Sequence, residues 1–104
     1  MKFRTLFMAH TPEAEKEEHK AKIETEKYVL YVNLVRGQEE ALKTAEEYAE
    51  KEGIQSIILC PGFTHEDVAE ISEALDDVGV TVARGDGPSG RIAKEAMQKA
   101  GWFE

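Results

Sequence analysis

The chain has little of three features that define whole classes of protein: cysteine, basic charge and long hydrophobic runs. Its single cysteine excludes an internal disulfide and a cysteine-rich zinc motif, and it fits a reducing compartment. The apolar runs are too short for a signal-peptide core or a membrane span. Only 13 basic residues stand against 21 acidic ones, so the formal net charge is −8. Nucleic acid and anionic membranes are therefore disfavoured as partners.

What is present suits one small globular domain. Hydrophobic residues make up 41% of the 104 residues, which is typical of a folded protein and not of a disordered one. A mass of 11.6 kDa leaves room for one hydrophobic core. We therefore expect residues 1–104 to form a single domain.

Four apolar runs divide the chain, and a segment that suits a helix follows each of them. The clearest helix is predicted over 38–51, where apolar residues recur at helical spacing. The first predicted helix, over 12–23, depends on a favourable start at Thr11 and Pro12 and has few apolar residues. The runs are residues 3–9, 28–35, 56–60 and 80–84; the other two helices follow Thr64 and Gly90.

Alternation of strand and helix indicates an α/β fold with a parallel sheet and right-handed crossovers. The favoured model is a small four-stranded, flavodoxin-like sheet. The alternative is a half-barrel of four βα units that completes itself by dimerisation. In both models the loops that follow the strands lie along one edge of the sheet, where ligands of such folds bind.

Arginine and histidine gather in these loops, although the protein as a whole is acidic. Three of the four arginines and two of the three histidines lie there, beside predicted helix starts. Guanidinium groups backed by helix N-termini favour a site for a small carboxylate or phosphate. The alternative is that the arginines pair with Glu66, Asp67 or Asp86 and hold the loops. The predicted ligand-binding residues are Arg36, Thr64, Arg84, Gly85, Gly87, Ser89, Gly90 and Arg91.

The segment Gly85–Gly90 matches the pattern G-x-G-x-x-G between a strand and a helix. It lies in the last βα unit, whereas a dinucleotide fingerprint occupies the first, and Pro88 removes one N–H group. We therefore expect no dinucleotide or other cofactor. Two interpretations stay open: a turn that binds a phosphate or carboxylate, and a flexible turn whose glycines adopt positive φ.

Catalytic candidates are few, and the sequence leaves open whether the protein is an enzyme. His65 and His10 are the best acid–base groups, and Asp86 is the candidate to orient them. Cys60 lies near a helix start with His65 as a possible base, but a lone cysteine after an apolar run also suits a buried site. No metal site is expected, because these four residues lack the dense spacing of zinc motifs.

The ending Gly101-Trp102-Phe103-Glu104 places two large aromatic residues together. They are expected to close the core beneath the last helix or to dock on a neighbouring subunit, and a homodimer is expected because a thin parallel sheet exposes its edges. This supports an alternative function, that of a non-catalytic, oligomeric interaction module. The favoured function remains the binding of a small anionic ligand at the sheet edge.

Three phrases resemble a known family: residues 6–10 (LFMAH), 58–65 (ILCPGFTH) and 83–87 (ARGDG). Over nearly its full length the chain is similar to a family of small prokaryotic α/β proteins classed as a domain of unknown function. The resemblance implies a cytoplasmic, single-domain prokaryotic protein. It brings no activity, cofactor or catalytic residue.

Overall fold

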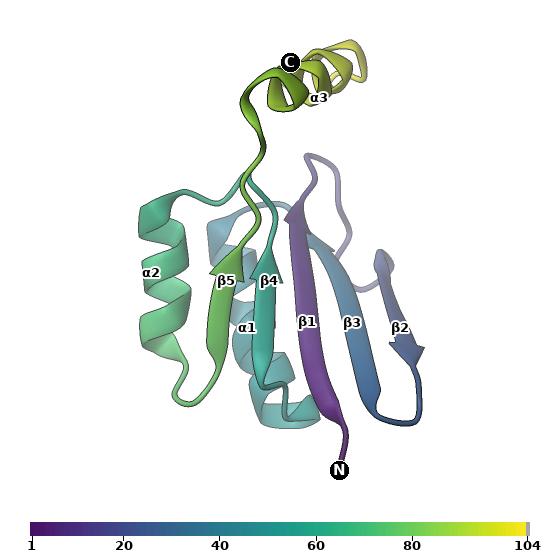
Figure 1. Ribbon diagram of the computed structural model, residues 1–104, viewed down its shortest axis with the longest axis vertical. Coiled ribbons are helices and arrows are strands. Elements are labelled where there is room, and N and C mark those ends of the chain that lie inside the picture. Colours follow the sequence, from purple (N-terminus) through teal and green to yellow (C-terminus); the bar gives the residue numbers. More distant parts are fainter. Residues whose placement is uncertain (104) are drawn as a thin grey trace.

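The computed structural model describes residues 1–103, and Glu104 lies outside the described residues. The elements are β1 (Phe3–His10), β2 (Lys20–Glu24), β3 (Tyr28–Val35), α1 (Gln38–Glu52), β4 (Ser56–Leu59), α2 (His65–Ala74), β5 (Gly79–Val82) and α3 (Gly87–Lys99). They form one mixed sheet with the order β2-β3-β1-β4-β5 and three helices (Figure 1). Only β2 runs antiparallel to its neighbour. No helix within residues 1–103 is long and apolar enough to cross a membrane.

The strand and helix pattern predicted from residue 28 onward is confirmed. β3 covers the predicted run 28–35, and α1 continues one residue beyond the predicted helix. Ala41 and Ala45 in its apolar stripe are fully buried. α1 ends at Gly53, whose φ of 66° lies in the left-handed region that glycine adopts without strain.

The helix predicted over residues 12–23 is wrong. Residues 11–19 form a loop, and Lys20–Glu24 form the antiparallel edge strand β2. The sequence Lys-Ala-Lys-Ile-Glu alternates polar and apolar residues, a period of two that favours a strand. A tight turn joins β2 to β3, because Thr25 and Tyr28 hydrogen-bond to each other. Pairing with β3 therefore outweighed the local helix-start signals around Pro12.

The sheet corrects the predicted fold in detail. Counted without β2, the four parallel strands follow the order 2-1-3-4, as in a flavodoxin-type sheet. An antiparallel strand replaces the helix after the first strand, so the protein is an α/β fold with a five-stranded, mostly parallel sheet, not a four-stranded flavodoxin-like one. The half-barrel alternative is wrong, because a barrel keeps strands in chain order and β1 lies between β3 and β4.

One face of the sheet carries the hydrophobic core. α1 and α2 pack against this face and against each other, and α1 lies behind the sheet in Figure 1. Phe63, in the loop before α2, is fully buried with them. The other fully buried core side chains are Leu6, Met8, Val29, Val35, Ala41, Ala45, Ile57, Leu59 and Ile71.

The opposite face, which we call the open face, has no helix across it among the described residues (Figure 1). Side chains alternate along each strand, so the odd-numbered positions of β1 and the even-numbered positions of β3 and β4 share this face. Phe3 and Ile23 are 51% and 58% exposed. The apolar residues of the open face are Phe3, Phe7, Ala9, Ala21, Ile23, Tyr28, Leu30, Val32, Leu34 and Ile58.

α3 stands above the strand ends, apart from the body of the domain (Figure 1). It buries no residue, and Ile92 in its apolar stripe is 64% exposed. Trp102 is half-buried and Phe103 is 56% exposed. The expectation that these aromatics close the core of their own chain is therefore not met for Phe103.

Candidate functional site

The loops after β1, β4 and β5 bring four predicted residues into one group, which we call the edge cluster: His10, Cys60, His65 and Arg84. The backbone N–H of His10 donates to Cys60 Sγ at 3.4 Å. Phe63 connects the two histidines indirectly. The His10 ring packs on the Phe63 ring, and the Phe63 carbonyl oxygen accepts from Arg84, which in turn contacts His65. Parallel strands end at the same edge, which explains why residues 74 positions apart in the chain share this cluster.

Arg84 ties the loop before α2 to the end of β5. Its Nη1 donates to the carbonyl oxygens of Phe63 at 2.9 Å and of Pro61 at 3.3 Å. Carbonyl oxygens carry no full charge, and Arg84 forms no ion pair with a carboxylate of residues 1–103. The pairing with Glu66, Asp67 or Asp86 considered from the sequence is therefore not observed. Its positive charge stays without a counter-charge.

The contact between Arg84 and His65 determines which nitrogen of the imidazole carries the proton. Arg84 Nη2 lies 3.3 Å from His65 Nδ1. Guanidinium groups donate and never accept, so Nδ1 accepts this hydrogen bond and the proton of neutral His65 lies on Nε2. The exposed His65 ring thus presents an N–H donor beside a cationic guanidinium.

His10 is packed into the base of the cluster. Its ring centroid lies 3.9 Å from that of Phe63, and its Nε2 is buried with no hydrogen-bond partner among the described residues. Burial lowers the pKa of His10 below its usual 6.5, and the nearby charge of Asp67 opposes this only in part. His10 is therefore neutral at pH 7, with one nitrogen available for a hydrogen bond.

Two backbone N–H groups at the start of α2 already donate hydrogen bonds within the chain. Thr64 Oγ1 accepts from the N–H of Asp67 at 3.1 Å, and the Asp67 carboxylate accepts from the N–H of Thr64 at 3.0 Å. These two hydrogen bonds form a capping box at the start of α2. These two N–H groups are occupied, so Thr64 has no free backbone donor for a ligand.

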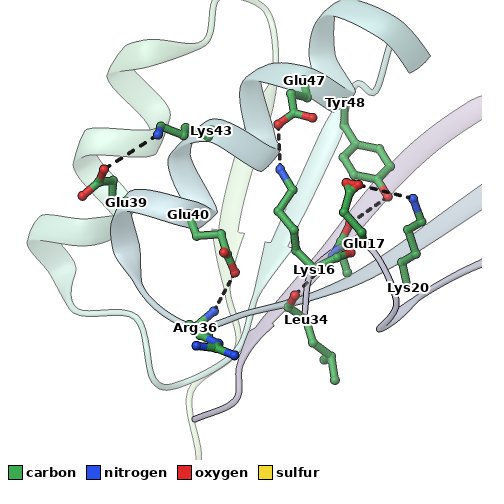
Figure 2. Close-up of polar contacts among 11 residues, drawn as sticks. Lys16, Glu17, Lys20, Leu34, Arg36, Glu39, Glu40, Lys43, Glu47 and Tyr48 are labelled. Atoms are coloured by element: carbon green, nitrogen blue, oxygen red, sulfur yellow. Dashed lines mark hydrogen bonds and ion pairs between the residues drawn. The ribbon is translucent and has the colours of Figure 1, made fainter. Parts of the chain in front are cut away.

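Arg36, the other strand-end arginine, lies in a different setting. Its Nη2 pairs with Glu15 at 2.6 Å and its Nε donates to the carbonyl oxygen of Ala14. Glu40 accepts from its backbone N–H, as Figure 2 shows. Two strands separate β3 from β5, a span of about 14 Å at the usual strand spacing. Arg36 and Arg84 therefore cannot both contact one small anion.

A shallow groove of about 490 Å³ lies beside Arg36, at the start of α1. Gly37 is the N-cap of α1 and provides no side-chain cap. The groove is lined by Lys16, Arg36, Gly37, Gln38, Glu39, Glu40 and Lys43. Both acidic residues lie in the first turn of α1, where they favour the positive helix end and occupy the region that an anion would need.

The glycine-rich segment does not form the flexible turn considered from the sequence. Gly85, Gly87 and Gly90 all lack positive φ, and the described glycines with positive φ are Gly53 and Gly101. Gly87 begins α3, with Asp86 as its N-cap. The Asp86 side chain makes no capping hydrogen bond and contacts neither candidate histidine through one. Ser89, Gly90 and Arg91 lie in the first turns of α3.

A second groove, between β2 and α1, was missed by the sequence interpretation. It has a volume of about 450 Å³. Its floor is Asn33, which donates to the carbonyl oxygens of Lys16 and Leu34 and accepts from Tyr48. Lys16 also pairs with Glu47. The signal was available in Lys20 and Lys22, whose alternation with apolar residues marks a strand that displays lysines on one face.

Apart from Lys51, the polar side chains that line this second groove have partners within the chain. Tyr31 accepts from Arg4 and donates to Glu52, and Lys22 lies over the Tyr31 ring. The groove is therefore held by contacts within the chain, and it offers no buried donor to a ligand. Among residues 1–103, no three His, Cys, Asp or Glu side chains are grouped to hold a metal ion.

Comparisons with known proteins agree with the resemblance noted from the sequence and add no ligand or activity. No curated protein matches the chain, and no solved structure matches it. One family model does match, over residues 2–98. The chain thus belongs to the family of unknown function DUF6506.

Proposed function

We propose that the protein binds a small anion, a carboxylate or a phosphate, at the edge cluster. The observation that carries the proposal is Arg84, a guanidinium with no carboxylate partner among residues 1–103, lying 3.3 Å from an exposed imidazole. Carbonyl contacts hold the guanidinium in place, so its orientation is set before a ligand arrives. A fixed planar cation is the group best matched to an oxyanion.

Three side chains have defined parts in this proposal. Arg84 supplies the charge and the donors that face outward. His65 adds an N–H donor through Nε2. His10 contributes a neutral ring that packs against Phe63, and its buried Nε2 has no hydrogen-bond partner among residues 1–103.

The surrounding negative charge favours a small ligand over a polymer. The net charge of −8 repels a polyanion that covers much of the surface, whereas a small anion interacts chiefly with the local field of Arg84. Asp67, whose charge acts on His10, accepts a hydrogen bond from the backbone N–H of Thr64. The capping hydrogen bond thus keeps that carboxylate directed at the helix start instead of at Arg84.

The test is a thermal-unfolding and calorimetric titration of the full chain with inorganic phosphate and with acetate. A ligand that binds only the folded state raises the unfolding temperature in a saturable way. His65→Ala is expected to weaken binding of the effective anion about fivefold to tenfold, because one hydrogen bond to an ion is lost. The matched control is His19→Ala, since His19 is also exposed but lies in the loop before β2.

Saturable binding that is weakened in His65→Ala and retained in His19→Ala supports the proposal. If neither anion binds to the wild type, or if both histidine variants bind equally well, the edge cluster is not the anion site.

A further inference from the structure

The open face and α3 are two apolar surfaces of the same chain, and neither is covered by another element among residues 1–103. The open face presents ten apolar side chains on four strands, whereas monomeric proteins rarely expose a contiguous apolar patch of more than a few hundred Å². α3 is amphipathic, with Ile92, Ala96 and Met97 on one stripe and Lys94 and Gln98 opposite. A stable protein in water covers such surfaces.

We propose that two copies of this chain form a symmetric dimer in which α3 of each copy packs on the open face of the other. This interface goes beyond anion binding and involves a different surface. In a two-fold dimer both copies use the same pair of surfaces, so the apolar patches are covered reciprocally and neither patch is left to add a third copy.

The dimensions of the two surfaces match. A 13-residue helix is about 20 Å long, and eight-residue strands are about 26 Å long. With Trp102 and Phe103 included, each helix-on-sheet contact would bury about 700 Å² in total. Two such contacts give about 1,400 Å², which lies within the usual range for a stable protein interface.

Charge supports a second copy of this chain as the occupant. α3 contains three basic residues and one acidic residue, so its net charge is +2, whereas the remainder of the chain carries −10. A basic helix is therefore attracted to the acidic body of another copy. The apolar stripe and the charge of α3 thus both fit the rest of this chain.

The path of the connector directs α3 away from its own open face. The last backbone hydrogen bond to the sheet is donated by Ala83 to Leu59. Arg84 then points to the α2 side, where it is held by the carbonyl oxygens of Pro61 and Phe63. α3 begins three residues later, above the strand ends (Figure 1). The helix is therefore displayed outward, where a second copy can receive it.

The first test is the mass of the full chain by light scattering, for the wild type and for two variants of α3. Ile92→Glu places a carboxylate in the apolar stripe, and Gln98→Glu adds the same charge on the opposite side of the helix. We expect a wild-type mass of twice 11.6 kDa. Ile92→Glu should be monomeric at concentrations where Gln98→Glu remains dimeric.

The second test identifies the surface that α3 contacts. It works for any position of the helix along the strands of the partner copy. A spin label is attached to the new cysteine of a Cys60→Ala, Gln98→Cys chain. This labelled chain is mixed with ¹⁵N-enriched Cys60→Ala chains, which have no cysteine and carry no spin label. We expect line broadening of amides in β1 and β3 of the ¹⁵N-enriched copy, which can arise only between copies.

Three results would overturn the proposal. A monomeric wild type would mean that α3 covers its own sheet or stays free. A dimer without broadening at β1 and β3 would place the interface elsewhere, for example at a sheet edge. A dimer that survives Ile92→Glu would remove α3 from the interface. None of these results depends on phosphate, so this proposal and the proposed function can fail separately.

Discussion

Arg36 and Arg84 occupy similar positions in the chain, but their guanidinium groups have different partners. Each follows a parallel strand and precedes a helix. Arg36 is neutralised by Glu15, with Glu40 on its backbone N–H, whereas Arg84 is held by two carbonyl oxygens and an imidazole. The comparison shows that a strand-end arginine becomes a candidate anion site only where the fold fixes it without a carboxylate.

The largest expected difference between the two arginines is in phosphate affinity, and it is tested by removing each guanidinium in turn. Arg84→Gln is expected to lower phosphate affinity about tenfold to a hundredfold, because a charged hydrogen-bond donor is lost. Arg36→Gln should change it less than about twofold, since that charge is already paired. Calorimetric titration of both variants measures the difference, and Arg84→Lys tests whether charge without the planar fork is enough. Equal losses in the two glutamine variants would contradict the comparison.

Asn33 holds the loop that supplies the partner of Arg36. Its side chain bonds to Lys16, Leu34 and Tyr48, and it is 2% exposed. Asn33→Ala leaves buried groups unpaired and is expected to lower the free energy of unfolding by about 2 kcal/mol. Tyr48→Phe, which removes one of these bonds, should cost about 1 kcal/mol. Urea unfolding measures both, and a neutral Asn33→Ala would show that the loop is held by other contacts.

Glu15 is the residue that most directly distinguishes the two arginines. In Glu15→Gln the Arg36 guanidinium loses its counter-charge, so a second phosphate site, weaker than the first, should appear in the groove at the start of α1. Stability should change by less than about 0.5 kcal/mol, because the ion pair is exposed. Amide shifts around Gly37 on phosphate addition report the new site. Their absence would mean that Glu39 and Glu40 suffice to exclude anions.

His10 provides the smallest effect and the only one that depends on pH. Burial holds its folded-state pKa below the value of 6.5 that it has in the unfolded chain. The unfolded state therefore binds the proton more readily, and stability is lost as pH falls through 6.5 toward the folded pKa. Unfolding free energies measured between about pH 7.5 and 5 should show this slope.

His10→Phe keeps a ring against Phe63 and removes the titrating group. The slope near pH 6 should be smaller in this variant than in the wild type. Equal slopes would show that His10 titrates alike in both states.

The elements that could be predicted from the sequence are those whose pattern lies within their own segment. β3 and α1 were predicted within a residue, because an apolar β-branched run and a helical stripe are contained in their own segments. Residues 12–23 were misread because the pairing of β2 with β3 is a tertiary effect that local start signals do not report. Parallel strands also explain why the edge cluster could be anticipated as a group.

The details of the cluster depend on contacts between distant segments. The Glu15 partner of Arg36 comes from a loop that had been predicted as helix, so this ion pair could not be foreseen. The contact of Arg84 with His65 depends on how the loop before α2 folds back over Phe63. The exposure of α3 was equally hidden, because an apolar helical stripe predicts burial without saying whose surface covers it.

The most direct test of the anion site is a phosphate titration of the ¹⁵N-enriched full chain followed by NMR. We expect saturable shifts of the amides of residues 60–65 and of Arg84, together with the His65 imidazole signals, while the amides of Arg36 and Gly37 stay unchanged. Saturable shifts centred on Arg36 and Gly37, or no saturable shift at residues 60–65 and Arg84, would contradict this expectation.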